Sequence, residues 1–249
     1  MMILHIFVAN VKMDYIMKKI LFLMAAALSF VFISCSDDKD EPETPDEYEY
    51  VDLGLPSGTL WATCNVGAKA PEEYGYYFAW GETSPKSDYT YETYKWCNGT
   101  MITLTKYNSR FEYGTVDGKY VLDDEDDAAY VNWGPSWRMP TSEQQRELLF
   151  ECSWEWTTRN GVNGRLATGP NGNTIFLPAA GYCSGSSNNS AGKRGVYWSS
   201  APDHAMPYTA HVLHFDSGDF DAGDKIDIWW GFYGRPGGAS VRAVRAPQN

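Results

Sequence analysis

A long apolar run, with Ser29 as its one polar residue, lies near the start of the chain over residues 20–33, and it directly follows two lysines. A basic start followed by an apolar stretch of this length is typical of a secretory signal peptide, and it is short for a membrane-spanning helix. The run ends at Ser34, directly before Cys35. The pattern therefore predicts a signal peptide over residues 1–34 and export of the rest of the chain.

Two helices are predicted after this segment. Thr141 follows Pro140 and stands three residues before Gln144, which is the spacing of a capping box. The apolar positions that then recur at helical spacing are Leu148, Leu149 and Cys152. One face of this helix should therefore dock on the core. A shorter helix is predicted over 124–131, because acidic residues in a first turn suit the helix dipole.

Strands dominate the remaining pattern. Apolar and polar residues alternate over 154–158, and the turn signals Asn160-Gly161 and Asn163-Gly164 come next. Further strands are predicted over 165–168, 174–177, 196–199, 209–215, 227–230 and 240–244. Near the last of these, Arg242 and Arg245 should face opposite ways, so one is a candidate for anchoring a buried acid. No linker interrupts residues 49–247, so we expect one domain of the α+β class.

The junction after the apolar run resembles a bacterial lipobox, because a small residue, Ser34, directly precedes Cys35. The resemblance implies that Cys35 becomes the lipidated first residue of the mature protein, carrying acyl chains such as palmitate. An ordinary signal peptide with an incidental cysteine is the alternative. Met17 begins a better signal sequence than Met1 does, so it is a candidate for the true start.

The segment over 35–48 is acidic and contains two prolines. Such a run cannot bury apolar surface and predicts a solvated tether. Acids directly after a lipidated cysteine also resemble the export signal of lipoproteins in Bacteroidetes-type bacteria. That resemblance implies an outer-membrane location, with the membrane reached through the lipid and the domain facing the cell exterior. A plain spacer on the periplasmic face is the alternative.

Composition adds one exclusion. The chain has 249 residues and a formal charge of −12, and removal of the signal peptide leaves 17 basic and 31 acidic residues, a charge of −14. Nucleic acid is therefore not an expected partner, because like charges repel. At least six of the acids lie in the tether, so the charge describes a solvated stalk more than a binding surface.

Four cysteines remain after Cys35, at 64, 97, 152 and 183. An exported protein can form disulfides, and a bond between Cys64 and Cys152 is the pairing we expect, with free buried thiols as the alternative. No pair has the C-x-x-C spacing of a zinc site. Cys183 sits in Gly-Tyr-Cys-Ser-Gly, which has the form of a nucleophile elbow. The residues after it favour a loop where the elbow needs a helix, so catalysis is not expected there.

Several segments together resemble the Fibrobacter succinogenes major paralogous domain family. They are Val51–Leu55, Trp61–Ala68, Tyr77–Glu82, Trp137–Thr141, Leu177–Tyr182, Tyr197–Ser200 and Ser240–Arg245. The family is similar to C-type-lectin-like folds, including formylglycine-generating enzymes. The resemblance implies a domain over 49–247 with two short helices, many short antiparallel strands and long loops. It implies that Trp61, Trp80, Trp137 and Trp198 are core residues. The redox cysteine pair of those enzymes has no counterpart after Gly231.

Two clusters are candidates for binding. Five adjacent acids could supply oxygen ligands to calcium, although acids are also common at helix starts. They are Asp123, Asp124, Glu125, Asp126 and Asp127. The second cluster is a set of rings beside a glycine-rich segment, which would present flat platforms to a sugar or a protein, unless the rings cover the core. Its members are Trp229, Trp230, Phe232 and Tyr233. His211 and His214 face opposite ways on a strand and form no metal pair.

These observations favour a surface-anchored lipoprotein that acts as a non-catalytic binding or adhesion module, with glycans or host proteins as candidate ligands. No cofactor is expected. One alternative is an enzyme related to formylglycine-generating enzymes, or a hydrolase, although G-x-S-x-G and H-E-x-x-H are both absent from the sequence. The other alternative is a structural subunit of a cell-surface assembly.

Overall fold

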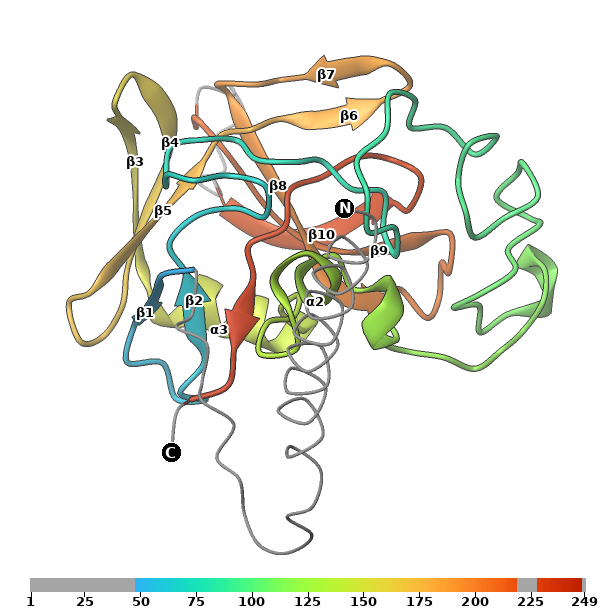
Figure 1. Ribbon diagram of the computed structural model, residues 1–249, viewed down its shortest axis with the longest axis horizontal. Helices are drawn as coiled ribbons and strands as arrows, with labels where there is room; N and C mark the ends of the chain where they lie inside the picture. Colours follow the sequence, from blue (N-terminus) through green and yellow to red (C-terminus); the bar gives the residue numbers. More distant parts are fainter. Residues whose placement is uncertain (1–47, 219–227, 248–249) are drawn as a thin grey trace, which may run out of the picture. The chain divides into compact units, whose positions relative to one another are not determined.

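Small antiparallel sheets and short helices make up the part of the chain that the computed structural model describes, residues 48–218 and 228–247 (Figure 1). The chain divides into two units, Met1–Pro45 and Asp46–Asn249, and every described residue belongs to the second. The predicted signal peptide, Cys35 and nearly all of the predicted tether lie outside the described residues. Within the described ranges, no helix combines the length and the apolar character needed to cross a membrane.

The first sheet joins the two ends of the described unit. Its strands are β1 (Tyr50–Asp52), β2 (Leu60–Ala62) and β11 (Val244–Arg245), in the order β1-β2-β11. Trp61 pairs with Val51 on one side and with Val244 on the other. The predicted last strand is therefore shorter than expected, because residues 240–243 form only isolated bridges and loop contacts.

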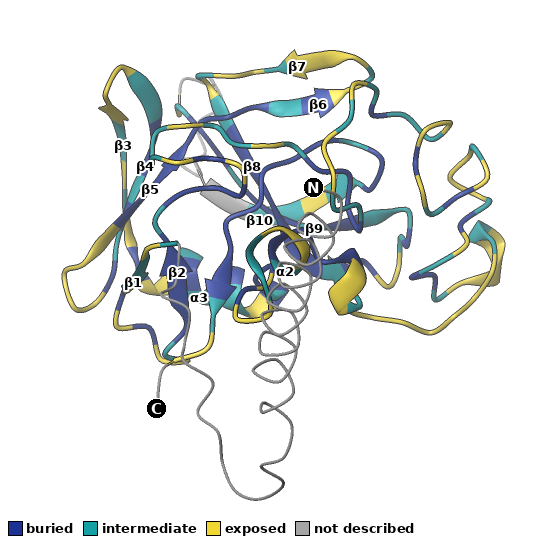
Figure 2. Ribbon diagram, in the orientation of Figure 1, coloured by how far each residue is buried: buried dark blue, intermediate teal, exposed yellow. Residues whose placement is uncertain are grey.

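The central sheet has the order β10-β9-β8 and contains the most deeply buried strand. Its strands are β8 (Arg194–Pro202), β9 (Thr209–Asp216) and β10 (Ile228–Gly234). Residues 195–200 are all buried, as the continuous dark segment in Figure 2 shows. Both faces of β8 are therefore covered, although β8 and β10 are the two edge strands of this sheet, on either side of β9.

Two further sheets flank this centre (Figure 1). One contains β3 (Ser153–Arg159), β4 (Val162–Thr168) and β5 (Thr174–Pro178), and the other is the hairpin of β6 (Tyr182–Ser184) and β7 (Ser187–Asn189). Asn160 and Gly161 both have positive φ, +48° and +81°, as a two-residue hairpin turn between β3 and β4 requires. The predicted turn at Asn160-Gly161 is confirmed, and Asn163-Gly164 instead lies inside β4.

Helix α3 (Ser142–Glu151) begins where the capping box predicts. The Thr141 hydroxyl accepts a hydrogen bond from the Gln144 backbone N–H at 3.1 Å, and the Gln144 side chain accepts one from the Thr141 N–H at 2.9 Å. Leu148 is completely buried and Cys152 nearly so, whereas Leu149 is only half-buried. The prediction of the helix start and of a core-facing side is therefore confirmed.

The predicted helix over 124–131 forms as two pieces. Asp124–Asp126 make a 3-10 turn, η2, and α2 (Ala128–Trp133) begins after it. Asp127 is the N-cap of α2, and its carboxylate accepts hydrogen bonds from Ala129 N and Tyr130 N. The acids therefore precede the α-helix, which begins at Ala128 because the Asp127 carboxylate satisfies the free N–H groups of its first turn.

The four tryptophans expected in the core are all at most 1% exposed: Trp61, Trp80, Trp137 and Trp198. The indole N–H of Trp80 donates to Ser199 O at 2.8 Å, and that of Trp198 donates to Phe78 O at 2.7 Å. These bonds tie the segment before residue 82 to β8 while the rings fill the core. The mixed helix and strand content confirms the α+β class.

Arg242 is buried, but it anchors no acid among the described residues. Its guanidinium donates to Asn65 Oδ1, Ala62 O and Phe176 O, at 3.0, 3.2 and 2.9 Å. For Arg242 the expectation of a buried acid is therefore wrong. The backbone oxygens of Ala62, at the end of β2, and of Phe176, within β5, take its place together with the Asn65 amide oxygen. Arg245 is half-buried and lies over the rings of Tyr50 and Trp137.

The predicted bond between Cys64 and Cys152 does not form, since all four described cysteines are free thiols. Cys64 donates to Ala68 O at 3.4 Å, whereas Cys152 packs in the core cluster around Leu148. Each thiol thus has its own buried environment. Burial raises the pKa of the Cys152 thiol to about 11, so it is protonated at neutral pH.

Candidate functional site

The predicted aromatic cluster divides between the two faces of β10. Successive side chains of a strand point to opposite sides, so Trp230 and Phe232 share one face and Tyr233 takes the other. Phe232 is 42% exposed and Trp230 is half-buried. The backbone of Trp229 pairs with that of His214, and its side chain lies outside the described part of the structure.

The outer face carries a row of three rings, which we call the aromatic shelf: His211, Trp230 and Phe232. The imidazole of His211 stacks on Trp230 with ring centroids 4.2 Å apart and an angle of 16° between planes. Its centroid lies 4.9 Å from that of Phe232, the residue directly opposite on β10. Cross-strand packing of this kind holds flat rings in place before any ligand arrives.

Helix α3 borders the shelf and adds charge to it. The guanidinium of Arg146 lies 5.5 Å from the centre of the Trp230 ring, and Glu143 of the same helix acts electrostatically on His211. Burial lowers the pKa of His211, so its imidazole is neutral at pH 7. Its Nδ1 and the Trp230 Nε1 are buried with no hydrogen-bond partner within the described ranges. Among the described residues, the shelf is thus an uncharged aromatic surface bordered by the Arg146 cation and the Glu143 carboxylate.

Tyr233 packs inward. Its ring lies 5.6 Å from that of Trp198 and 5.5 Å from that of Tyr182, and its hydroxyl donates to Cys183 O at 3.0 Å. A Cβ on Gly237 would come within 2.3 Å of the Tyr233 ring, so only glycine leaves room for it. The structure does not bring Tyr233 together with the shelf, and the alternation of the strand could have separated them in advance.

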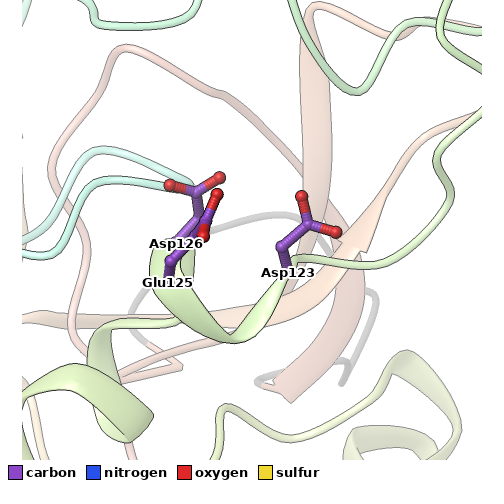
Figure 3. A group of neighbouring side chains, drawn as sticks. All are labelled: Asp123, Glu125 and Asp126. Atoms are coloured by element: carbon purple, nitrogen blue, oxygen red, sulfur yellow. The ribbon is translucent and has the colours of Figure 1, made fainter.

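The acids predicted to bind calcium form ion pairs with lysines. Figure 3 shows Glu125 and Asp126 on the η2 turn and Asp123 just before it. Lys106 Nζ lies 2.6 Å from a carboxylate oxygen of Asp123 and 2.6 Å from one of Asp126. Lys95 Nζ approaches the other oxygen of Asp126 at 3.0 Å. Asp123, Glu125 and Asp126 place carboxylate oxygens within 4.8 Å of one another, as a metal site would. Two of these carboxylates, those of Asp123 and Asp126, are already bridged by the ammonium group of Lys106.

The five acids consequently have different roles. Hydrogen bonds from Lys106 and Lys119 lower the pKa of Asp123 to about 2. Asp126 also accepts the Tyr107 hydroxyl at 2.7 Å. Asp127 caps α2 and accepts Met139 N at 2.8 Å. Asp124 and Glu125 are exposed. The geometry describes an ion-pair network that fastens a loop, and calcium would have to displace Lys106 to bind.

Cys183 lacks the surroundings of a nucleophile. It lies on β6, and the chain continues through a tight turn into β7, so the expected loop is a hairpin and no helix follows. Burial raises the pKa of its thiol to about 11, which keeps it protonated. Burial also lowers the pKa of His214, to about 4, so this imidazole is neutral and lies within the sheet.

One set of partly exposed aromatic residues was missed by the sequence reasoning. Tyr48, Tyr76 and Trp133 line a hollow between the start of β1, the segment after β2 and the end of α2. Their positions are far apart along the chain, and the segments that resemble the paralogous domain family include none of them. The one local signal is Gly67, which lies beneath the ring of Tyr76.

Comparisons of the chain with models of protein families, with curated proteins and with solved structures find no match in any of the three. Function is therefore inferred from the geometry of the described residues.

Proposed function

We propose that this protein is a non-catalytic binding module, held at the outer face of a bacterial outer membrane by a lipid on Cys35. Its aromatic shelf would contact glycans or host proteins. The observation that carries the proposal is the stack of His211 on Trp230 beside the exposed ring of Phe232. A rigid, uncharged row of rings with an arginine at its edge offers apolar area and a donor, which suits sugar faces and protein surfaces alike.

The chemistry of the described residues supports binding over catalysis. Burial keeps the thiols of Cys152 and Cys183 protonated, and it lowers the pKa of His211 and His214, which makes both imidazoles weaker bases. A nucleophile needs a base within hydrogen-bond reach, and the hydrogen bonds of the Cys64 and Cys97 thiols go to backbone carbonyls.

In the described part of the chain, the short antiparallel strands, two short α-helices and the long segment over 82–127 support our assignment to the C-type-lectin-like folds and to the Fibrobacter succinogenes major paralogous domain family. Within such a fold, loops and sheet edges vary while a buried aromatic core stays in place. The shelf at the edge strand β10 is placed as a variable contact surface would be.

Binding is tested with full-length protein purified in detergent and applied to an array of glycans, mucins and matrix proteins. We expect at least one class of ligand on the array to bind. Phe232→Ala should weaken this binding about tenfold, because a desolvated ring at the centre of a contact contributes about 1.4 kcal/mol or more to the binding free energy. Phe150→Ala is the matched control, since Phe150 is 71% exposed on α3. An array that is silent throughout would refute the proposed function.

Anchoring is tested separately in cells that express the full chain. Labelled palmitate should enter the wild-type protein and not the Cys35→Ala variant, and protease added to intact cells should degrade the wild type. Palmitate label that persists in the Cys35→Ala variant would show that Cys35 is not the lipidated residue. Protection from protease would place the domain on the periplasmic side.

A further inference from the structure

A hollow of about 500 Å³, which includes no residue of the aromatic shelf, is lined by both aromatic and polar side chains. We call it the tyrosine pocket and define it by Tyr48, Glu49, Lys69, Tyr76, Asn132 and Trp133. Its volume is in the range of pockets that hold small ligands. All six residues belong to the described unit, and the pocket contains none of the predicted binding residues.

The first wall is a rigid pair of stacked rings. Tyr48 lies on Trp133 with centroids 4.0 Å apart and only 10° between planes. Trp133 in turn meets the buried Trp137 edge-on at 5.2 Å. The pair therefore stands on the core and loses little conformational freedom when a ligand stacks against it.

The second wall is the ring of Tyr76, which is 47% exposed. A Cβ on Gly67 would lie 2.4 Å from this ring, so the ring rests directly on the glycine backbone. Gly67 has φ +85°, which other residues rarely adopt. An edge contact to Phe78 at 6.3 Å also fixes the ring. The ring is thus held open to solvent by its neighbours.

Hydrogen-bonding groups of both kinds also line the hollow. Glu49 supplies a carboxylate and Lys69 an ammonium group, and both side chains are exposed. Asn132 donates from Nδ2 to Thr83 O and Ala128 O, which turns its carbonyl oxygen into the free acceptor of that side chain. One acid and one base cancel in charge, so the pocket favours a neutral ligand with many hydroxyl groups.

We infer that the tyrosine pocket binds a neutral pyranose residue of a saccharide. A pyranose has an apolar C–H face that stacks on an aromatic ring, and a rim of hydroxyls that both donate and accept hydrogen bonds. Aromatic rings and side chains that donate and accept hydrogen bonds line the same hollow, which therefore matches both features. The site shares no lining residue with the aromatic shelf, so the inference adds a second binding site to the proposed function.

The test uses full-length protein in detergent and saturation-transfer NMR with cellotetraose, maltotetraose, the N-acetylglucosamine tetramer and N-acetyllactosamine. We expect at least one of these neutral probes to bind, and Tyr76→Ala to weaken it about tenfold or more. Tyr76→Phe keeps the ring and should bind within about twofold of wild type. Phe232→Ala, on the shelf, should bind the same probe as wild type does.

A second variant guards against misfolding of Tyr76→Ala. Lys69→Ala changes only an exposed side chain and should weaken the same probe several-fold while the thermal unfolding midpoint is unchanged. The inference is overturned if none of the four probes binds, or if Tyr76→Ala and Lys69→Ala both bind normally. If arrays remain positive and only Phe232→Ala loses binding, the pocket proposal fails and the proposed function stands.

Discussion

Arg235 and Arg242 are both buried to within 1% of full burial, and both donate to oxygen atoms of uncharged groups. They serve different regions. Arg242 joins β2 to β5 through Ala62 O and Phe176 O. Arg235 joins loops, since it donates to Lys106 O, Tyr107 O and Pro207 O and to the Tyr94 hydroxyl.

The difference between the two arginines shows how the loop-rich region is stabilised. Strands satisfy their carbonyls through ladders, whereas the long segment over 82–127 has few such partners and needs another donor. A guanidinium carries five N–H donors in a fixed plane and can serve several carbonyls at once. The rings of Trp80 and Tyr94 lie 4.8 and 5.3 Å from the guanidinium of Arg235 and enclose it.

The largest expected effect comes from Arg235→Met. This substitution leaves several buried carbonyls without a donor, each costing about 1–3 kcal/mol, so we expect a loss of about 4 kcal/mol in the free energy of unfolding. Urea denaturation measures it. Arg110→Met, at a residue whose side chain is 46% exposed, should change stability by less than about 0.5 kcal/mol.

Arg242→Met should cost about 3 kcal/mol, because it removes three hydrogen bonds where Arg235→Met removes four. Hydrogen exchange sharpens the comparison. In Arg242→Met, the protection of backbone amides from exchange should fall in β2 and β5. In Arg235→Met, it should fall over residues 94–108. The same exchange pattern in both variants would show that the two regions unfold together. That result would contradict the claim that the two arginines stabilise different regions.

His214 gives the strand region a pH dependence. Burial, and then the charge of Arg194, lowers its folded pKa from 6.5 to about 4. The neutral ring therefore contributes stability that is complete above pH 6.5 and is lost as pH falls toward 4. The loss is up to about 3 kcal/mol, since one pKa unit is worth about 1.4 kcal/mol. His214→Gln should flatten the stability profile over this window, and an unchanged slope would contradict the assignment.

The loop region should respond at lower pH. The lysines hold the pKa of Asp123 at about 2, and they also lower the pKa of Asp126 despite its burial. Folded pKa values below the unfolded ones give stability that is present above about pH 4 and is lost as pH falls toward 2. Asp126→Asn should cost about 2 kcal/mol at pH 7. Exchange over residues 104–117 should show the change first.

Short sequence patterns predicted the structural features that depend on residues close together in the chain. The capping box marked the start of α3, and paired strands formed around the turn at Asn160-Gly161. The alternation rule also held, and applied to β10 it separates Tyr233 from Phe232. The acids at 123–127 were harder to interpret, because their lysine partners Lys95 and Lys106 come from another loop.

Features that depend on distant contacts could not be predicted in this way. Cys64 and Cys152 lie beside suitable apolar segments, but their thiols end in separate environments. The tyrosine pocket combines residues from positions 48, 76 and 133, and no spacing in the sequence joins them. Arg235 also has no signal in the sequence, since its acceptors are three backbone oxygens and the Tyr94 hydroxyl, all more than 25 residues away.

The most direct test of binding through the shelf is a paired array measurement on wild type and Phe232→Ala, with Phe150→Ala as the control. The proposal predicts a set of glycans or host proteins that bind wild type and Phe150→Ala equally and bind Phe232→Ala about tenfold more weakly. Equal binding by all three proteins would show that the shelf is not the contact surface, and that result would contradict the account.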